Sequence, residues 1–154
     1  MHSANPHRLL FALACAAALG PAAAAEVAIS NVQPLAFGSF TAGPGSVTVG
    51  ADGARAASGN VVLLGTDPGQ AAQFVVTGDA NASFAVTLPA DGLVTLGNGS
   101  LNMPVNAFTS SPASTGVLSG GGSLTLNVGA TLEVAAGQST GGYSGSFTVV
   151  VNYN

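Results

Sequence analysis

Side chains that carry acid, base or nucleophilic chemistry are few in this chain of 154 residues, and they are widely spaced. Both histidines, the cysteine and one of the two cationic residues precede residue 26, so residues 26–154 hold a single arginine, Arg55, and six carboxylates. General acid–base and nucleophilic catalysis need a histidine, cysteine or lysine, or paired carboxylates in a pocket. We therefore expect this protein not to be an enzyme and to bind no cofactor.

The carboxylates lie at positions where they are expected to bond turn backbone rather than a substrate. Asp52, Asp67 and Asp91 each lie next to or near glycine or proline, where aspartate accepts hydrogen bonds from turn backbone. Glu133 is expected on the solvent side of an alternating strand. Residues 79–81 have alternating oxygen donors but lack the third ligand and the final glutamate of a complete calcium loop, so we expect no metal site.

Charge excludes another class of partner. Without the first 25 residues the balance is one arginine against six carboxylates, 1 − 6 = −5. A basic surface for nucleic acid cannot be built from Arg55 alone. We expect Arg55 to pair with Asp52 across a hairpin turn, a contact that contributes about 0–1 kcal/mol when exposed.

Residues 1–25 have the order of a secretory signal peptide: Arg8, an apolar run over residues 9–19, a break at Gly20-Pro21, and small residues up to Ala25. We predict cleavage after Ala25 and export to the periplasm, the cell surface or the medium. A lipoprotein signal ending at Cys15 is the alternative. The apolar run is shorter than the roughly 18–20 residues that span a bilayer, so we expect no membrane span in the mature chain.

The remaining residues alternate valine, leucine, phenylalanine and threonine with glycine, serine and asparagine, which predicts an all-β domain with glycine and proline at the turns. Turn signals recur about every 8 to 12 residues, as in a β-sandwich or barrel. The expected extended segments are residues 26–33, 35–40, 46–50, 60–64, 71–77, 83–88, 93–96, 103–108, 123–128, 131–135 and 143–153.

Several turns define how these segments should connect. Asp52-Gly53 is a hairpin signal and is expected to join residues 46–50 to residues 60–64. Because Pro104 cannot donate a backbone hydrogen bond, residues 103–108 are expected to form an edge strand or a loop. Residues 109–116 are expected to form a loop, and Gly129-Ala130 to separate two strands.

The C-terminal stretch is strongly patterned. Every second residue from Tyr143 to Tyr153 falls on one face, and all of these except Gly145 are large and apolar or aromatic. A chain end normally frays. A half-buried strand with nothing after it in the chain needs a neighbour from elsewhere.

Six segments follow one another through nearly all of the chain after residue 25. They are LAFG (35–38), GSVTV (45–49) followed by Asp52, Gly53 and Arg55, FVVTG (74–78), VTLP (86–89), VGATL (128–132) and GYSGSFTVVVNYN (142–154). No single one of these motifs is specific, but their order is. The ordered set resembles the bacterial family known as domain of unknown function 4402.

This resemblance implies an exported Gram-negative protein similar to spore coat protein U and to chaperone-usher pilus subunits, with an immunoglobulin-like sandwich that lacks its last strand. In such subunits the C-terminal strand, with its penultimate tyrosine, lines a groove. A periplasmic chaperone fills the groove first, and the N-terminal extension of the next subunit replaces it. Here the groove-facing row would be Phe147, Val149, Val151 and Tyr153.

The implied donor arm is residues 26–34, ahead of a sandwich domain over residues 35–154. It departs from the family pattern by being short, with Val27 and Ile29 as its in-phase apolar residues. Each contributes about 1.5–3 kcal/mol if fully buried, against an ordering cost of about 1–2 kcal/mol per residue. The arm therefore has two readings: it donates to a neighbouring subunit, or it completes the sheet of its own chain.

The leading hypothesis is an exported, non-enzymatic structural or adhesive protein that forms a homopolymer or joins related pilus subunits by strand addition. The first alternative is a self-contained binding module whose loops, such as residues 109–116, recognise a carbohydrate or a surface protein. A small outer-membrane barrel is the second alternative, although such barrels need strands of about 10 residues and aromatic girdles.

Overall fold

A computed structural model describes residues 26–154, and the predicted signal peptide lies outside the described residues. The described chain contains strands but no helix. Its strands are β1 (Ala28–Gln33), β2 (Phe40–Thr41), β3 (Gly45–Val49), β4 (Arg55–Gly59), β5 (Val62–Leu63), β6 (Ala72–Thr77), β7 (Ser83–Thr87), β8 (Val94–Gly97), β9 (Asn102–Ser111), β10 (Thr115–Val117), β11 (Ser123–Val134) and β12 (Val150–Tyr153).

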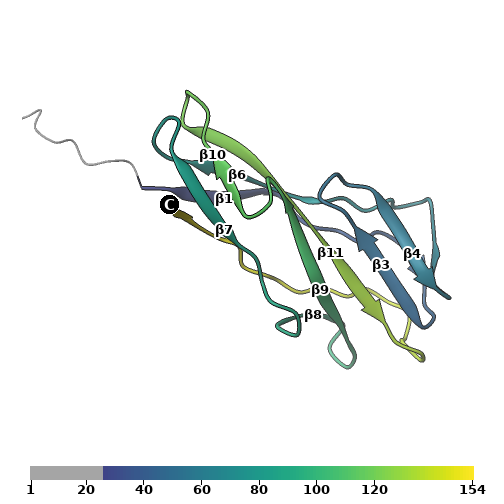
Figure 1. Ribbon diagram of the computed structural model, residues 1–154. Coiled ribbons are helices and arrows are strands. Elements are labelled where there is room, and N and C mark those ends of the chain that lie inside the picture. The colour runs from purple at the N-terminus through teal and green to yellow at the C-terminus, as the bar shows by residue number, and fades with distance from the viewer. Residues whose placement is uncertain (1–25) are drawn as a thin grey trace, which may run out of the picture.

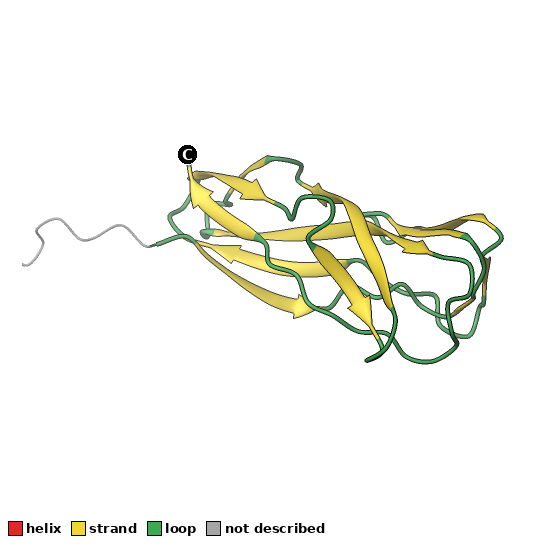
Figure 2. Ribbon diagram, turned by 90° about the horizontal axis from the view of Figure 1, so that it is seen from below, coloured by secondary structure: helices red, strands yellow, loops and turns green. Residues whose placement is uncertain are grey.

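The strands form two main layers, seen edge-on in Figure 2. The larger sheet has seven strands, and five of them have the spatial order β1-β6-β11-β3-β4. Strand β9 also pairs with β11, and β8 pairs with β9. The smaller sheet has the order β10-β7-β12, and β2 pairs with β5. This arrangement confirms the expected all-β sandwich. In both views residue 26 and the C-terminus lie at the same end of the molecule (Figures 1 and 2).

Strand β11 is the centre of the larger sheet (Figure 1). Its residues 123–128 pair with β6 and its residues 130–134 pair with β3, while residues 127–132 pair with β9. Since β9 overlaps both of the other partners, β6 and β3 share one edge of β11 and β9 takes the other. The expected break at Gly129-Ala130 was wrong: a Cβ on Gly129 would lie 2.1 Å from the Val49 carbonyl oxygen, so this glycine permits a close strand approach instead of a turn.

The hairpin at Asp52-Gly53 is confirmed, but its second strand was wrongly placed. Strand β3 pairs with β4 (Arg55–Gly59), not with residues 60–64. The tight turn has Gly53 at φ 87°, and the Asp52 carboxylate accepts a hydrogen bond from the Ala54 N–H at 3.0 Å. The small, polar and mostly exposed residues of β4 have no apolar alternation, which is why pattern reasoning passed over them.

Strand β9 corrects two further expectations. It runs ten residues and lies between β8 and β11, and residues 109–116 are not one loop, because they hold the end of β9 and the start of β10. Pro104 is tolerated since β8 pairs with residues 102–105 and β11 with residues 105–111. At Pro104, β9 therefore has one registered neighbour, and the missing N–H costs no ladder bond on the other side.

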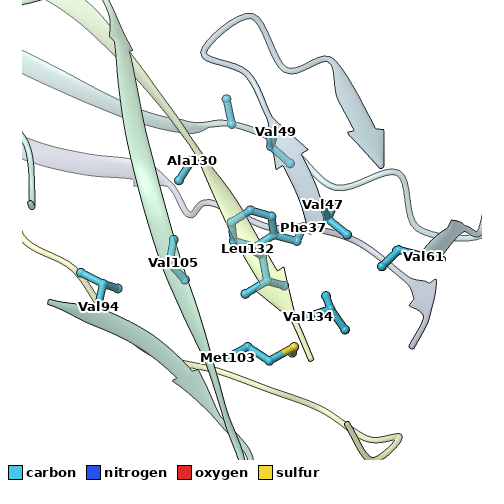
Figure 3. Close-up of a cluster of buried hydrophobic side chains, with 11 residues drawn as sticks. Phe37, Val47, Val49, Val61, Val94, Met103, Val105, Ala130, Leu132 and Val134 are labelled. Atoms are coloured by element: carbon cyan, nitrogen blue, oxygen red, sulfur yellow. The ribbon is translucent and has the colours of Figure 1, made fainter. Parts of the chain in front are cut away.

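The interior divides into two clusters of buried side chains. The first lies around β3, β9 and the second half of β11, and Figure 3 shows Val47, Val105 and Leu132 converging there. The second gathers Val76, Phe84, Leu126 and other residues around β6, β7 and β12. Leu35, Phe108 and Phe147 pack against both clusters, so they join the two halves of the core.

Arg55 makes a different contact from the one expected. Its guanidinium donates to the carbonyl oxygens of Phe37, Ser39 and Leu64 at 2.9, 3.0 and 2.8 Å, rather than pairing with Asp52. Asp52 stands at the turn tip and bonds backbone there. Gly38, at φ 77°, leaves room for this contact, because a Cβ there would lie 2.4 Å from Arg55 Nη1. Arg55 thus fastens the segment after β1 to the β3–β4 hairpin.

Candidate strand-addition edge

The last stretch of the chain is fastened at both ends and unpaired in the middle. Ser144 exchanges two backbone hydrogen bonds with Gly97 of β8, at 2.8 and 2.9 Å. Strand β12 pairs with β7. Between these points, residues 145–149 make no backbone hydrogen bond to any other described segment. The expected strand over residues 143–153 is therefore confined to Val150–Tyr153, because β7 ends at Thr87 and offers residues 145–149 no ladder partner.

The direction of the backbone groups in β12 follows from its ladder. The Asn154 N–H donates to the Ser83 carbonyl at 3.2 Å. In an antiparallel pair, hydrogen-bonded residues alternate with non-bonded ones. Val150 and Asn152 therefore direct their N–H and C=O groups toward β7, whereas Val151 directs them away from it. The Val86 N–H, opposite Val151, agrees: it turns to the far side of β7 and donates to the Ser114 carbonyl at 2.8 Å.

The alternate side chains of this stretch, from Phe147 to Val151, point into the protein. Val149 and Val151 are 7% and 9% exposed and belong to the second core cluster. Phe147 packs edge-on against Phe74, with ring centroids 6.2 Å apart, and at a tilt against Phe108 at 5.0 Å. Residues 147–153 thus have the alternating burial of an inner strand but the backbone pairing of an edge.

The penultimate tyrosine holds the end of this segment in place. The Asp79 N–H donates to the Tyr153 hydroxyl oxygen at 2.7 Å, in the turn between β6 and β7. Gly78 makes this approach possible, since a Cβ there would clash with the Tyr153 hydroxyl oxygen. The tyrosine ring packs against the second core cluster, so both its apolar and its polar parts are used.

The predicted arm lies in the chain's own sheet. Strand β1 pairs with β6 from Ala28↔Thr77 to Gln33↔Gln73, and Val27 and Ile29 pack against the second core cluster. All six residues predicted from the sequence therefore lie in or against the second core cluster: Phe147, Val149, Val151, Tyr153, Val27 and Ile29. Strand β1 runs close to β12, but no ladder joins them.

The carboxylates do not gather into a reactive site. Asp52 and Asp67 accept hydrogen bonds from N–H groups two residues further on, as expected for turn aspartates. Asp91 bonds instead to the Ala107 N–H of β9 at 2.8 Å, and Glu133 is exposed. Within residues 26–154, no three His, Cys, Asp or Glu side chains are close enough to hold a metal ion.

Residues 26–154 contain no helix with the length and apolar character that would let it span a membrane.

Sequence reasoning missed the contacts that fasten the edge. The bond from Asp79 to Tyr153 joins residues 74 positions apart, and nothing in the local pattern signals it. The bridge from Ser144 to Gly97 also joins residues far apart in the sequence, and it involves backbone only. A glycine directly after a strand, as at Gly78, was the one available signal that another group approaches closely there.

Residues 27–153 match the protein family described as "Domain of unknown function (DUF4402)". No curated protein matches the chain. No solved structure matches it either.

Proposed function

The chain belongs to this domain-of-unknown-function family, whose description names no activity, and we propose that it is an exported, non-enzymatic structural or adhesive protein. We propose further that it assembles by accepting an extended strand along β12 and residues 145–149. The partner segment comes from another copy of this chain or from a related subunit. A periplasmic chaperone occupies the edge beforehand.

One observation carries this proposal: residues 145–149 are unpaired along their backbone, while the side chains of Phe147 and Val149 lie against and in the second core cluster. Backbone N–H and C=O groups are strong hydrogen-bonding groups, and a row of them at a sheet edge is a template for another strand. An added strand would gain ladder bonds to Val149 and Val151 without moving their side chains from the core. This is β-augmentation, in which main-chain bonds supply affinity.

The position of β1 constrains where the added strand comes from. Because β1 is paired with β6, its transfer to a neighbour would break the ladder at residues 28–33 and withdraw Val27 and Ile29 from the core. Donation by this arm is therefore a strand exchange between chains, in which the donor loses the pairing of its own β1 with β6.

The test fills the edge from within the chain. A variant of residues 26–154 carries a short turn and a second copy of residues 26–33 after Asn154. We expect it to be monomeric by light scattering and to melt at a higher temperature than the parent chain. The matched control replaces the copied Val27 and Ile29 with serine and should neither stabilise the chain nor block assembly. Heat-sensitive multimers of the parent chain on gels are the assembly readout, and a parent chain that stays monomeric at high concentration would contradict the proposal.

A second function, a self-contained binding module, is favoured by the pairing of β1 within its own sheet. Here the edge stays open in the working protein and recognition occurs elsewhere on the surface. Deleting residues 26–34 separates the two functions. A binding module should unfold without ever having formed multimers, whereas an assembling subunit should lose multimers that the full chain forms.

A further inference from the structure

A polar depression of about 310 Å³ lies where the neighbours of β11 change. Strands β6 and β3 pair with the same edge of β11, one after the other. The β6 pairing ends at Ala72, opposite Val128, and the β3 pairing begins at Val49, opposite Ala130. The loops that follow β3 and precede β6 diverge at this point and wall the depression. Its lining consists of Gln33, Ala51, Asp52, Gly53, Gly69, Gln70, Ala71, Gln73 and Asn127.

The floor of this depression is a row of amides in register. Gln33 of β1 lies opposite Gln73 of β6, and Gln73 lies opposite Asn127 of β11. The neighbours of Asn127 along β11, Leu126 and Val128, are fully buried, so Asn127 stands on the outer face of the sheet. Three amide side chains on three adjacent strands therefore share one face.

The hydrogen bonds within the depression leave oxygen atoms to spare. Gln33 Nε2 donates to the Ala71 carbonyl at 2.9 Å, and Gln70 Nε2 donates to the Pro34 carbonyl at 3.0 Å. These bonds orient both amides by their nitrogen ends and use neither Oε1. Asn127 Oδ1 is buried and has no partner. Burial of an unpaired polar atom costs about 1–3 kcal/mol, which a bound ligand or water recovers.

The chemistry of the lining selects a neutral, hydroxyl-rich ligand. With no lysine, arginine or histidine, the lining offers an anion no counter-charge, and Asp52 alone is too few carboxylates for a cation. A hydroxyl group both donates and accepts, so it satisfies an amide oxygen or an amide nitrogen equally well. If the oxygen and nitrogen of Asn127 were exchanged, a hydroxyl would still be its complement.

From this geometry we infer that the amide depression formed by Gln33, Gln70, Gln73 and Asn127 binds a saccharide. No residue of β12 or of residues 143–149 lines it, so a strand added at the β12 edge leaves the site open. A subunit that donated its own β1 would lose Gln33 from the lining, so an assembled protein would present the complete site on each subunit whose β1 stays paired with β6.

The test is a titration of monomeric residues 26–154 followed by two-dimensional NMR of the backbone and side-chain amides. The probes are D-glucose, D-galactose, D-mannose and N-acetyl-D-glucosamine at up to about 50 mM, well above a dissociation constant on the order of 1 mM. We expect at least one sugar to give saturable shifts that centre on Gln33, Gln70, Gln73 and Asn127. The absence of saturable shifts with all four sugars would overturn the inference and leave ordered water as the occupant.

Two variants assign any binding to the depression. Asn127→Leu keeps the side-chain size and removes its hydrogen bonds, so affinity should fall at least tenfold while the melting temperature stays equal or rises. Gln73→Leu should give the same loss and serves if Asn127→Leu does not fold. The matched control is Thr125→Val, on the same face of β11 and outside the lining, which should bind as the parent does. Unchanged affinity in both amide variants would contradict the assignment.

Discussion

Strands β11 and β12 bury their side chains in the same way and differ in how their backbones are paired. In β11 the alternate residues from Leu126 to Val134 are buried, and in residues 147–153 the same alternation recurs. Over residues 127–132, however, β11 has partners on both edges, whereas β12 has β7 on one edge and no ladder on the other.

This difference shows that side-chain burial and backbone pairing are separate properties of a strand. A period of two reports which face is covered, because successive side chains point to opposite faces. It contains no information about the lateral neighbours, since those are bonded through main-chain groups that every residue has. An inner strand and an open edge can therefore have the same pattern.

The largest effect is expected where β11 is closest to its neighbours. Gly129→Ala places a Cβ 2.1 Å from the Val49 carbonyl oxygen and 2.5 Å from the Gly50 carbonyl carbon. Since both contacts are backbone, the strands must separate, and we expect a loss of about 3–5 kcal/mol in the free energy of unfolding. Chemical denaturation measures it. Gly142→Ala, ahead of β12 and in open space, is the control and should change little; equal losses in the two variants would remove the contrast.

A matched truncation compares the two strands directly. Val128→Ala in β11 should cost about 2–3 kcal/mol, because its site is closed on every side and a cavity remains. Val151→Ala in β12 should cost about 1–2 kcal/mol, since the chain beside the open edge can relax inward. Denaturant midpoints of both variants at equal slope give the comparison. A larger loss at Val151 would mean that the edge is packed as rigidly as the centre.

A smaller effect is expected at the fastening of β12. Tyr153→Phe removes the acceptor of the Asp79 N–H bond and keeps the ring in the core. We expect a loss of about 1 kcal/mol. If this bond only holds the strand end, assembly should be unaffected, and thermal melts together with light scattering test both statements. A variant of parental stability would show that the hydroxyl contact contributes nothing net.

The smallest effect on stability is expected from Val150→Lys, whose side chain is 43% exposed on the outer face of β12. The free energy of unfolding should change by no more than about 0.5 kcal/mol. A lysine on an edge strand opposes pairing with further strands, so multimers should become fewer. Lysine at Thr48, which is exposed on β3 and has a registered partner in both β11 and β4, is the control. Equal assembly of the two lysine variants would argue against β12 as the contact edge.

Much of the fold was predictable because it depends on alternation and turn chemistry. The segments around Phe74, Phe84 and Leu126 form strands as expected, and Asp52-Gly53 forms its hairpin. Two of the errors share a cause: Gly129 and Pro104 were assigned by their usual local roles, whereas their neighbours decide their conformation. Gly129 lies in a close strand approach, and Pro104 lies where β9 has one registered partner.

The candidate site was predictable in its side chains and not in its pairing. The alternation of Phe147, Val149 and Val151 correctly indicates burial, since these residues lie in or against one cluster. The place where the strand stops being paired depends on where β7 ends, at Thr87, a feature of another part of the chain. The amide row has even less signal, because Gln33, Gln73 and Asn127 are far apart in sequence and meet only through strand register.

Residue-resolved hydrogen exchange of the monomer tests the open edge most directly. The N–H groups of Val150 and Asn152 point to β7, and those of Val149 and Val151 point to the open side, within one short segment and one local stability. We predict that Val149 and Val151 exchange at least about tenfold faster than Val150 and Asn152, and that assembly slows them. Equal protection of all four amides in the monomer would contradict the open edge and, with it, strand addition at β12.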